Sequence, residues 1–359
     1  MRSDKVIVIA EAGVNHNGSV EQAMKLIDVA AEAGANIVKF QTFSAKNLVI
    51  KSAKKADYQI RNIGNSDTQY EMLKQLELTY NQFYILKQHC IDRNIEFLST
   101  PFDDESLYFL VHNLNINYIK VPSGEITNYP FLLKMAKMGL PLIVSTGMTS
   151  LSEIELALAV IAFGLLDKKE KPSIENFMDA YYSEEGQNTL IKNVTLLHCT
   201  SEYPVPFDEV NLNTIKTLNA SFNLNVGLSD HSEGIAVPIA ATALGATIIE
   251  KHFTLDKNLP GPDHKASLNP NELKEMIKCI RQVEKSLGHG RKVPALSELK
   301  NRKIVRKVLV ASRQITKGES FTEQNVSMKR AGFGMSPLKY WDVIGSHAKK
   351  DFNEDEIIE

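Results

Sequence analysis

Residues 6–18, VIVIAEAGVNHNG, show in one stretch the pattern that most of the chain repeats. A short apolar run (6–10) is followed by the polar residues Glu11 and 15–18, and a helical pattern then covers 20–33 behind the cap-like Ser19. An apolar run, a polar end and a helical pattern follow one another many times. This order is typical of βα units around a parallel sheet.

The number of these units decides between architectures. We expect eight strands, over residues 6–10, 36–40, 96–99, 117–121, 142–145, 194–199, 226–229 and 247–252. Helices are expected over residues 20–33, 81–93, 104–114, 130–137, 151–165, 211–220, 234–244 and 270–287. Eight units predict a TIM (β/α)8 barrel, because an open doubly wound sheet usually has about five or six strands. Two segments, 44–78 and 166–192, exceed normal loop length and are interpreted as lids or insertions.

A change in composition marks the end of the barrel. Residues 289–303, HGRKVPALSELKNRK, are polar and basic, as an interdomain connection should be. The pattern after them, with VLVASRQI and the turn Lys317-Gly318, indicates a small, mainly β domain. We therefore assign 1–287 to the barrel, 288–300 to a linker and 301–359 to the small domain.

Charge and composition exclude several classes of protein. The 359 residues include 41 basic and 43 acidic residues, and the net charge of −2 argues against a protein that coats nucleic acid or anionic membrane. The uncharged stretch 235–249 is shorter than the ~20 residues of a membrane span, and the apolar run of MRSDKVIVIA is too short for a signal peptide. Cys90, Cys199 and Cys279 lack metal-type spacing, which favours reduced thiols. We expect a cytoplasmic protein.

Charged side chains follow the apolar runs, where a TIM barrel has its active site. Lys39 and Lys120 lie near the ends of two predicted strands, together with several hydroxyl residues. Because an unpaired buried charge is costly, these lysines predict a site for an anionic ligand. The alternative is that Lys39 and Lys120 form internal ion pairs with Glu11 and Glu125.

Histidines at strand ends indicate a metal. His231 and His252 end consecutive predicted strands, about 5 Å apart in a parallel sheet, and Glu11 belongs to the strand that adjoins the last one in a closed barrel. This mixed nitrogen and oxygen set suits Mn²⁺ better than a closed structural zinc site. His16 and His198 are further candidates.

A set of motifs then identifies a family. IAEAGVNHNG, VKFQTF, LSTPFD, KVPSGEITN, VSTGM, LHCTSEYPVPF, VGLSDHS, IEKHFTLD and GPDHKASL occur in this order. The chain therefore resembles the sialic acid synthase family, the phosphoenolpyruvate-dependent nonulosonate synthases. Residues 306–332, RKVLVASRQITKGESFTEQNVSMKRAG, resemble the antifreeze-like (SAF) domain that closes these enzymes.

The resemblance implies a reaction and a set of site residues. Phosphoenolpyruvate would condense with the open-chain aldehyde of a 2-acetamido sugar, consuming water and releasing phosphate. The metal, Mn²⁺ or another divalent cation such as Mg²⁺ or Co²⁺, would be held by His231 and His252. The implied catalytic residues are Glu11, Glu125 and Arg330. The implied phosphoenolpyruvate ligands are Lys39, Thr100, Lys120, Ser123, Ser145 and Ser229. The implied sugar pocket consists of Gln41, Phe102, Ser201, Tyr203, Asp263 and Arg330.

Alternatives remain for the assembly and for the sugar. The resemblance implies a domain-swapped homodimer in which Arg330 enters the partner's site, although Ala331 stands where many relatives have proline. The leading sugar is N-acetylmannosamine, which gives N-acetylneuraminate. The runner-up is 2,4-diacetamido-2,4,6-trideoxymannose, the sugar of legionaminic acid synthase, and Ser201 stands where some members have asparagine. A Schiff-base aldolase using Lys39 or Lys120 is the alternative of another class.

Overall fold

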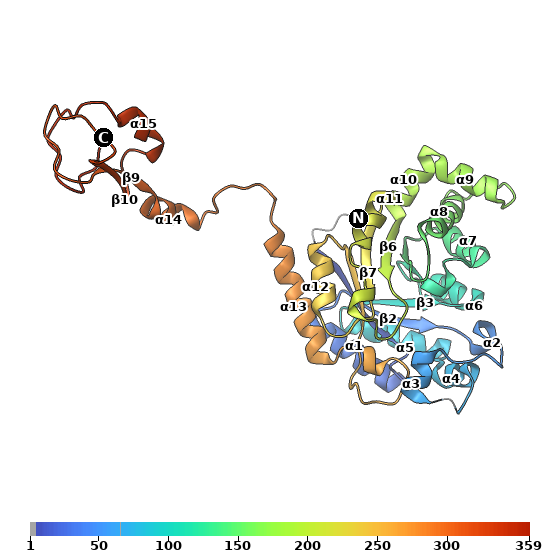
Figure 1. The fold of residues 1–359 in the computed structure, drawn as a ribbon. Coiled ribbons are helices and arrows are strands. Elements are labelled where there is room, and N and C mark those ends of the chain that lie inside the picture. Colours follow the sequence, from blue (N-terminus) through green and yellow to red (C-terminus); the bar gives the residue numbers. More distant parts are fainter. Residues whose placement is uncertain (1–4, 65) are drawn as a thin grey trace. The chain divides into compact units, whose positions relative to one another are not determined.

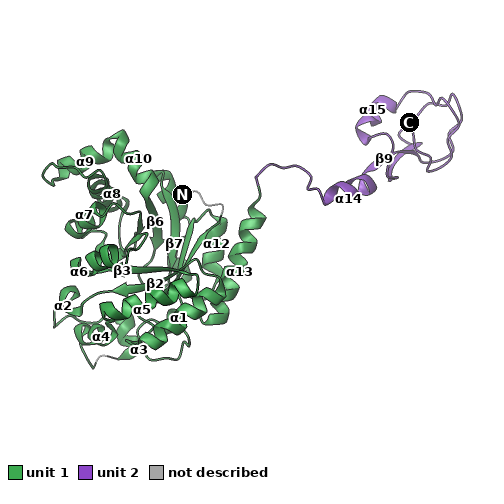
Figure 2. Cartoon of the chain, turned by 180° about the vertical axis from the view of Figure 1, so that it is seen from behind, with its two compact units in different colours: residues 1–288 green, residues 289–359 purple. Residues whose placement is uncertain are grey.

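The chain is composed of two compact units, which are residues 1–288 and 289–359 (Figure 2). The computed structural model describes residues 5–64 and 66–359. The first four residues of the N-terminal segment, and one residue within the predicted insertion 44–78, therefore lie outside the described part. Each unit is described by itself below.

The first unit contains a sheet of eight parallel strands, as predicted. Hydrogen bonds connect them in the order β3-β2-β1-β8-β7-β6-β5-β4, and β3 also contacts β4, so the sheet curves into a barrel. The strands are β1 (Ile7–Gly13), β2 (Ile37–Thr42), β3 (Glu96–Pro101), β4 (Ile119–Val121), β5 (Leu142–Ser145), β6 (Val194–Cys199), β7 (Asn225–Asp230) and β8 (Ile248–His252).

Helices surround the strands (Figure 1). They are α1 (Val20–Ala33), α5 (Tyr80–Asp92), α6 (Asp104–Tyr108), which continues into a π-helical turn (Phe109–Asn113), α7 (Tyr129–Lys137), α8 (Leu151–Leu165), α11 (Thr214–Phe222), α12 (Ala236–Ala243) and α13 (Pro270–Leu287). The hydroxyl of Ser19 caps α1, as expected. α5 begins one residue earlier than expected, because Thr79 caps it and forms a reciprocal capping box with Gln82. Among the described residues, no helix has both the length and the apolar character that crossing a membrane requires.

The two long insertions are helical and occupy different places. The first forms α2 (Ala45–Leu48), α3 (Asp57–Ile63) and α4 (Gln69–Leu76). Met72 and Leu76 of α4 pack with Val14 and Phe43, which follow β1 and β2, so this insertion lies at the C-terminal mouth of the barrel. The second forms α9 (Ile174–Tyr182) and α10 (Glu184–Asn193), which pack against α8 on the outside of the barrel.

Inside the barrel, an apolar layer lies below a polar layer. The apolar layer contains Ile9, Ile37, Leu98, Ile143, Leu197 and Ile248. Alternate residues of a strand share a face, so the next side chains that point inward are two positions further along. These side chains are Glu11, Lys39, Thr100, Ser145, Cys199 and Glu250, and all are buried. The strand pattern thus places a polar ring on an apolar floor.

The second unit has its own small core around a two-stranded antiparallel sheet, β9 (Lys307–Ala311) and β10 (Val326–Arg330). Isolated bridges extend this sheet, for example between Ile315 and Phe352. Two short helices complete the unit, α14 (Glu298–Val305) and α15 (Tyr340–Val343). The sequence did not predict α14, which spans the boundary drawn between linker and small domain.

Candidate active site

Lys39 lies at the centre of the polar layer. Its Nζ is 2.8 Å from Glu11 Oε2 and 3.6 Å from Glu250 Oε2. It also donates a hydrogen bond to Thr100 Oγ1 at 3.0 Å. Three neighbouring parts of the barrel, β1, β3 and β8, therefore supply the partners of one buried ammonium group.

Lys120 is held in a similar way, but its carboxylate partner is not the expected one. Its Nζ donates to Ser145 Oγ at 2.7 Å and lies 3.5 Å from Glu250 Oε1. Ser229 donates to the same Glu250 oxygen at 2.8 Å. The proposed pair between Lys120 and Glu125 is therefore wrong, and Glu250 connects the two lysines.

The pKa values of the two carboxyl groups in this network are shifted in opposite directions. Burial raises the pKa of Glu11 to about 7, although Lys39 opposes this shift. Burial acts in the same direction on Glu250, but Lys120 and Lys39 together outweigh it and lower the pKa of Glu250. Near neutral pH the network therefore holds two lysines, one ionised carboxylate and a second carboxyl group that can be protonated. A net positive charge inside a buried site favours an anionic ligand.

Glu125 and Ser123 lie side by side in sequence but have different neighbours. Glu125 is half-buried and accepts a hydrogen bond from Asn128 at 2.7 Å. Ser123 Oγ accepts a hydrogen bond from the backbone N–H of Gly147 at 3.1 Å. A Cβ atom on Gly147 would lie only 2.4 Å from Ser201 Oγ and 2.7 Å from Ser123 Oγ, so these two hydroxyls converge on one point. The carboxylates paired with the two lysines are those of Glu11 and Glu250, whereas Glu125 is bound by Asn128.

The two predicted metal ligands are brought together. The rings of His231 and His252 are buried, with centroids 5.6 Å apart. The Nδ1 atom of His252 is buried and has no hydrogen-bond partner, whereas Nδ1 of His231 is 2.7 Å from the carbonyl of Thr200. A buried nitrogen without a partner fits a pair that binds a divalent ion.

Glu11 lies opposite His252 in the strand register, as expected for the acidic neighbour of the histidines. Its Oε2 atom is paired with Lys39. Within residues 5–64 and 66–359, no group of three or more His, Cys, Asp or Glu side chains could hold a metal ion. The protein thus offers two histidines, and the remaining ligand positions would be filled by water or substrate.

The other two candidate histidines have different roles. The ring of His16 accepts a hydrogen bond from the N–H of Gly18 at 3.0 Å, and burial lowers its pKa to about 4. Nε2 of His198 is 2.6 Å from the carbonyl of Val210. Both rings hold loops in place, and neither lies with the pair His231 and His252.

Aromatic and acidic side chains surround the histidines. The ring centroid of Tyr203 is 4.0 Å from that of His231, and Tyr58 of α3 packs against Tyr203 at 4.9 Å. Asp263 is buried, its Oδ1 has no partner, and burial raises its pKa to about 6. A carboxylate with an unused oxygen is suited to accept a hydrogen bond from a sugar hydroxyl.

The remaining sugar-pocket candidates lie at the mouth. Gln41 Nε2 donates a long hydrogen bond of 3.5 Å to Glu11 Oε1. Phe102 packs edge to face against Phe43 at 6.3 Å, within the apolar cluster that α4 covers. Gln41 thus contacts the acidic residue of the site, whereas Phe102 belongs to its apolar border.

Two residues of this site were missed from the sequence. Glu250 received no role, although its position two residues before His252 places both on the inner face of β8. Tyr58 lies within an insertion, where no strand end points to it. Only its aromatic side chain in a predicted lid could have suggested a contact with the site.

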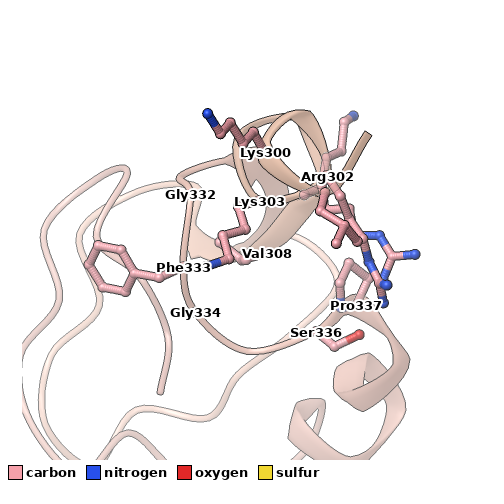
Figure 3. Close-up of a pocket in the computed structure, with 12 residues that line it drawn as sticks. Lys300, Arg302, Lys303, Val308, Gly332, Phe333, Gly334, Ser336 and Pro337 are labelled. Atoms are coloured by element: carbon pink, nitrogen blue, oxygen red, sulfur yellow. The ribbon is translucent and has the colours of Figure 1, made fainter. Parts of the chain in front are cut away.

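The second unit has a basic cavity of its own, about 780 Å³ in volume (Figure 3). Five cationic residues line it, which are Lys300, Arg302, Lys303, Arg306 and Lys307. Arg330 does not line this cavity. It is exposed at the end of β10, where it pairs across the sheet with Lys307. Its action in a partner's site stays a prediction.

Comparisons with known proteins find a family match in each part of the chain. Residues 26–292 match the NeuB family, and residues 306–359 match the SAF domain. The chain is 48% identical to N,N'-diacetyllegionaminic acid synthase of Campylobacter jejuni over 99% of both chains. It is 44% identical to the synthase of the same name from Legionella pneumophila, over 94% of this chain and 89% of the relative. The crystal structure of the N-acetylneuraminic acid synthetase of Leptospira borgpetersenii in complex with citrate is 33% identical, with a TM-score of 0.65 over 83% of this chain and 90% of that one. The chain therefore belongs to the NeuB family of synthases and ends in a SAF domain.

Proposed function

We propose that this enzyme condenses phosphoenolpyruvate with 2,4-diacetamido-2,4,6-trideoxymannose, so that it acts as an N,N'-diacetyllegionaminic acid synthase. The observation that carries the choice of sugar is the 48% identity to a synthase of that name over 99% of both chains. Identity to the N-acetylneuraminic acid synthetase is 33%. The sequence alone favoured N-acetylmannosamine, whereas the identity to this synthase favours the diacetamido sugar.

Phosphoenolpyruvate has two anionic groups, and the site has two buried lysines to receive them. Lys39 and Lys120 would each donate charge-assisted hydrogen bonds to the carboxylate or the phosphate. Glu250 lies between the two ammonium groups and fixes their spacing before substrate arrives. The hydroxyls that would complete the binding of the anion are those of Thr100, Ser123, Ser145 and Ser229.

Glu11 is placed to act on the carbon that becomes cationic. When C3 of phosphoenolpyruvate attacks the sugar aldehyde, positive charge develops at C2, and a nearby carboxylate stabilises it. Glu11 Oε2 is held by Lys39, and Oε1, which accepts a long hydrogen bond from Gln41, would orient water toward C2 and accept a proton from it. A pKa near 7 allows this exchange of protons at neutral pH.

The metal and the sugar would share the other side of the site. His231 and His252 would hold Mn²⁺, or Mg²⁺ or Co²⁺, which polarises the sugar aldehyde as a Lewis acid. The side chains that would surround the sugar are Gln41, Phe102, Ser201, Tyr203 and Asp263. Glu125, which accepts a hydrogen bond from Asn128, would take its catalytic role from a place beside Ser123.

Arg330 would complete the site of a second subunit in a domain-swapped homodimer. It is exposed and lies directly across β9–β10 from Lys307. Like charges that face each other across a sheet are unfavourable, and an anionic or hydroxyl-rich partner would relieve this repulsion. A guanidinium group could then bind the sugar through two parallel hydrogen bonds.

Product analysis tests the reaction class. With phosphoenolpyruvate, the diacetamido sugar and Mn²⁺, the enzyme should form one phosphate for each molecule of nine-carbon acid, and a chelator should stop both. A Schiff-base aldolase would instead use pyruvate, release no phosphate and leave Lys39 or Lys120 covalently trapped by borohydride. Trapping without phosphate release would refute the proposal.

A further inference from the structure

His231 lies outside the regular part of the sheet. β7 ends at Asp230, and the final pair in the register between β7 and β8 joins Asp230 to Lys251. His252, in contrast, is the last residue of β8 and lies opposite Glu11 of β1. The two histidines are therefore presented by a strand and by the loop that follows its neighbour.

Lys251 bridges this gap from the opposite face of β8. Its Nζ lies 2.6 Å from Asp230 Oδ2 and also donates to the carbonyl of Ser232. Asp230 Oδ1 in turn accepts a hydrogen bond from the N–H of Ser232 at 2.9 Å. The residue that precedes His252 thus binds the chain on both sides of His231.

The ion pair of Lys251 and Asp230 is buried, and stability alone does not explain a buried ion pair. The side chains of Lys251 and Asp230 are 0% and 1% exposed, and α12 contacts both strands that carry them. Burying an ion pair is costly, and apolar residues of similar volume often stabilise a protein as well or better. A hydrogen-bonded ion pair fixes the distance and direction between its two residues, whereas an apolar pair does not.

The polar contacts of His231 itself lie on the side of β6. Its carbonyl accepts a hydrogen bond from the N–H of Val205, and its Nδ1 lies 2.7 Å from the carbonyl of Thr200 and 3.8 Å from Sγ of Cys199. These partners belong to the end of β6 and to the loop that follows it. Lys251 supplies the link toward β8, where His252 lies. Metal ligands tolerate errors of only about 0.2 Å in their distances, so this link has a direct bearing on metal affinity.

We propose that Asp230, Lys251 and the backbone of Ser232 form a clamp that sets the spacing of His231 and His252, so that Asp230 and Lys251 are positioning residues for the metal. The inference rests on the metal site of the proposed function. It assigns a role to two charged residues that touch neither substrate nor metal.

The test measures Mn²⁺ binding to the substrate-free protein, by the electron paramagnetic resonance signal of free Mn²⁺. The variant Asp230→Asn/Lys251→Met removes both charges with little change in volume and keeps an acceptor for the N–H of Ser232. The matched control is Arg281→Met/Glu284→Leu. That ion pair also binds backbone, at Val6, but at the N-terminal end of the barrel.

The clamp predicts that Mn²⁺ binds about tenfold to a hundredfold more weakly to the Asn/Met variant, while the control binds as wild type does. Thermal unfolding in chelator should show that both variants are folded. If the Asn/Met variant does not fold, Asp230→Asn/Lys251→Gln takes its place, because the glutamine amide can still donate to the Ser232 carbonyl. A loss of more than about threefold in that variant supports the clamp.

Two results would overturn the inference, and they differ. If wild type binds Mn²⁺ and the folded clamp variant binds it within about threefold, the clamp is wrong and the metal site stands. If wild type and the His231→Ala variant bind Mn²⁺ equally weakly, the metal site itself is wrong and the clamp has no function to serve.

Discussion

Lys39 Nζ lies 2.8 Å from Glu11 Oε2, and both side chains are buried at the C-terminal end of the barrel. The lysine assigned to the substrate anion is therefore also the partner of the acidic residue assigned to catalysis. In the proposed function, phosphoenolpyruvate would add to this pair rather than replace it. The raised pKa of Glu11 makes this feasible, because a protonated Glu11 leaves the charge of Lys39 available.

Removing either lysine should weaken phosphoenolpyruvate binding more than sugar binding. One charge-assisted contact contributes about 1.5 to 3 kcal/mol, so Lys39→Ala and Lys120→Ala should each raise the Michaelis constant for phosphoenolpyruvate at least about tenfold. Steady-state kinetics with the other substrate saturating measures this. An unchanged constant in both variants would make them structural ion pairs only.

Replacement of the histidines should abolish metal-dependent turnover. His231→Ala and His252→Ala should bind Mn²⁺ weakly and lose activity, while their circular dichroism and unfolding temperature in chelator stay close to wild type. His198→Ala serves as the control, because His198 contacts a backbone carbonyl away from the pair. Full activity of both single variants in metal-depleted buffer would contradict the assignment.

Asp263 should make the substrate-free protein less stable at high pH. Burial raises its pKa from 3.8 to about 6, so the folded state binds the proton more tightly than the unfolded state does. Ionisation of the buried carboxyl group lowers the free energy of unfolding. This loss is absent well below pH 3.8, grows between pH 3.8 and 6, and is complete above that range. Two pKa units correspond to about 3 kcal/mol at most.

Asp263→Asn should therefore unfold at the same denaturant concentration as wild type near pH 4 and at a higher one near pH 8. Its activity should fall, because an amide replaces the carboxylate assigned to a sugar hydroxyl. Equal or lower stability of the variant at pH 8, measured in chelator, would show that Asp263 is not a strained buried carboxyl group.

Mixed dimers should reveal whether Arg330 acts in a partner's site. His252→Ala and Arg330→Ala chains should each be inactive, yet a fully exchanged equal mixture should recover about a quarter of wild-type activity, since half the dimers are mixed and each has one intact site of two. Fluorescence transfer between labelled chains verifies the exchange. No recovery after exchange, or a fully active monomer, would contradict the arrangement.

The periodic parts of the fold could be predicted from the sequence, and the errors at three strand ends have a common cause. Helices 20–33, 151–165 and 270–287 were predicted within their observed bounds, because caps and apolar spacing coincide there. Strands β1, β2 and β3 continue further than expected, to Gly13, Thr42 and Pro101. Each extension includes a polar residue, namely Glu11, Gln41 and Thr100, so the hydrogen-bonded ladder continues after the apolar run has ended.

The candidate site residues came from motifs, but their pairing could not be read from them. The alternative to an anion site was that Lys120 pairs with Glu125, whereas the barrel brings Lys120 to Glu250 from a distant strand. Tyr58 reaches Tyr203 only because α3 folds over the mouth. Contacts between strands and insertions depend on packing, which sequence spacing alone does not encode.

The central claim is that this barrel joins phosphoenolpyruvate to a diacetamido sugar, and one kinetic comparison tests it most directly. The rate of phosphate release should be measured with Mn²⁺, saturating phosphoenolpyruvate and each sugar in turn. The account predicts a kcat/KM for 2,4-diacetamido-2,4,6-trideoxymannose at least about a hundredfold above that for N-acetylmannosamine, as expected where a site hydrogen-bonds groups that the other sugar lacks. A higher kcat/KM for N-acetylmannosamine, or no sugar-dependent phosphate release at all, would contradict it.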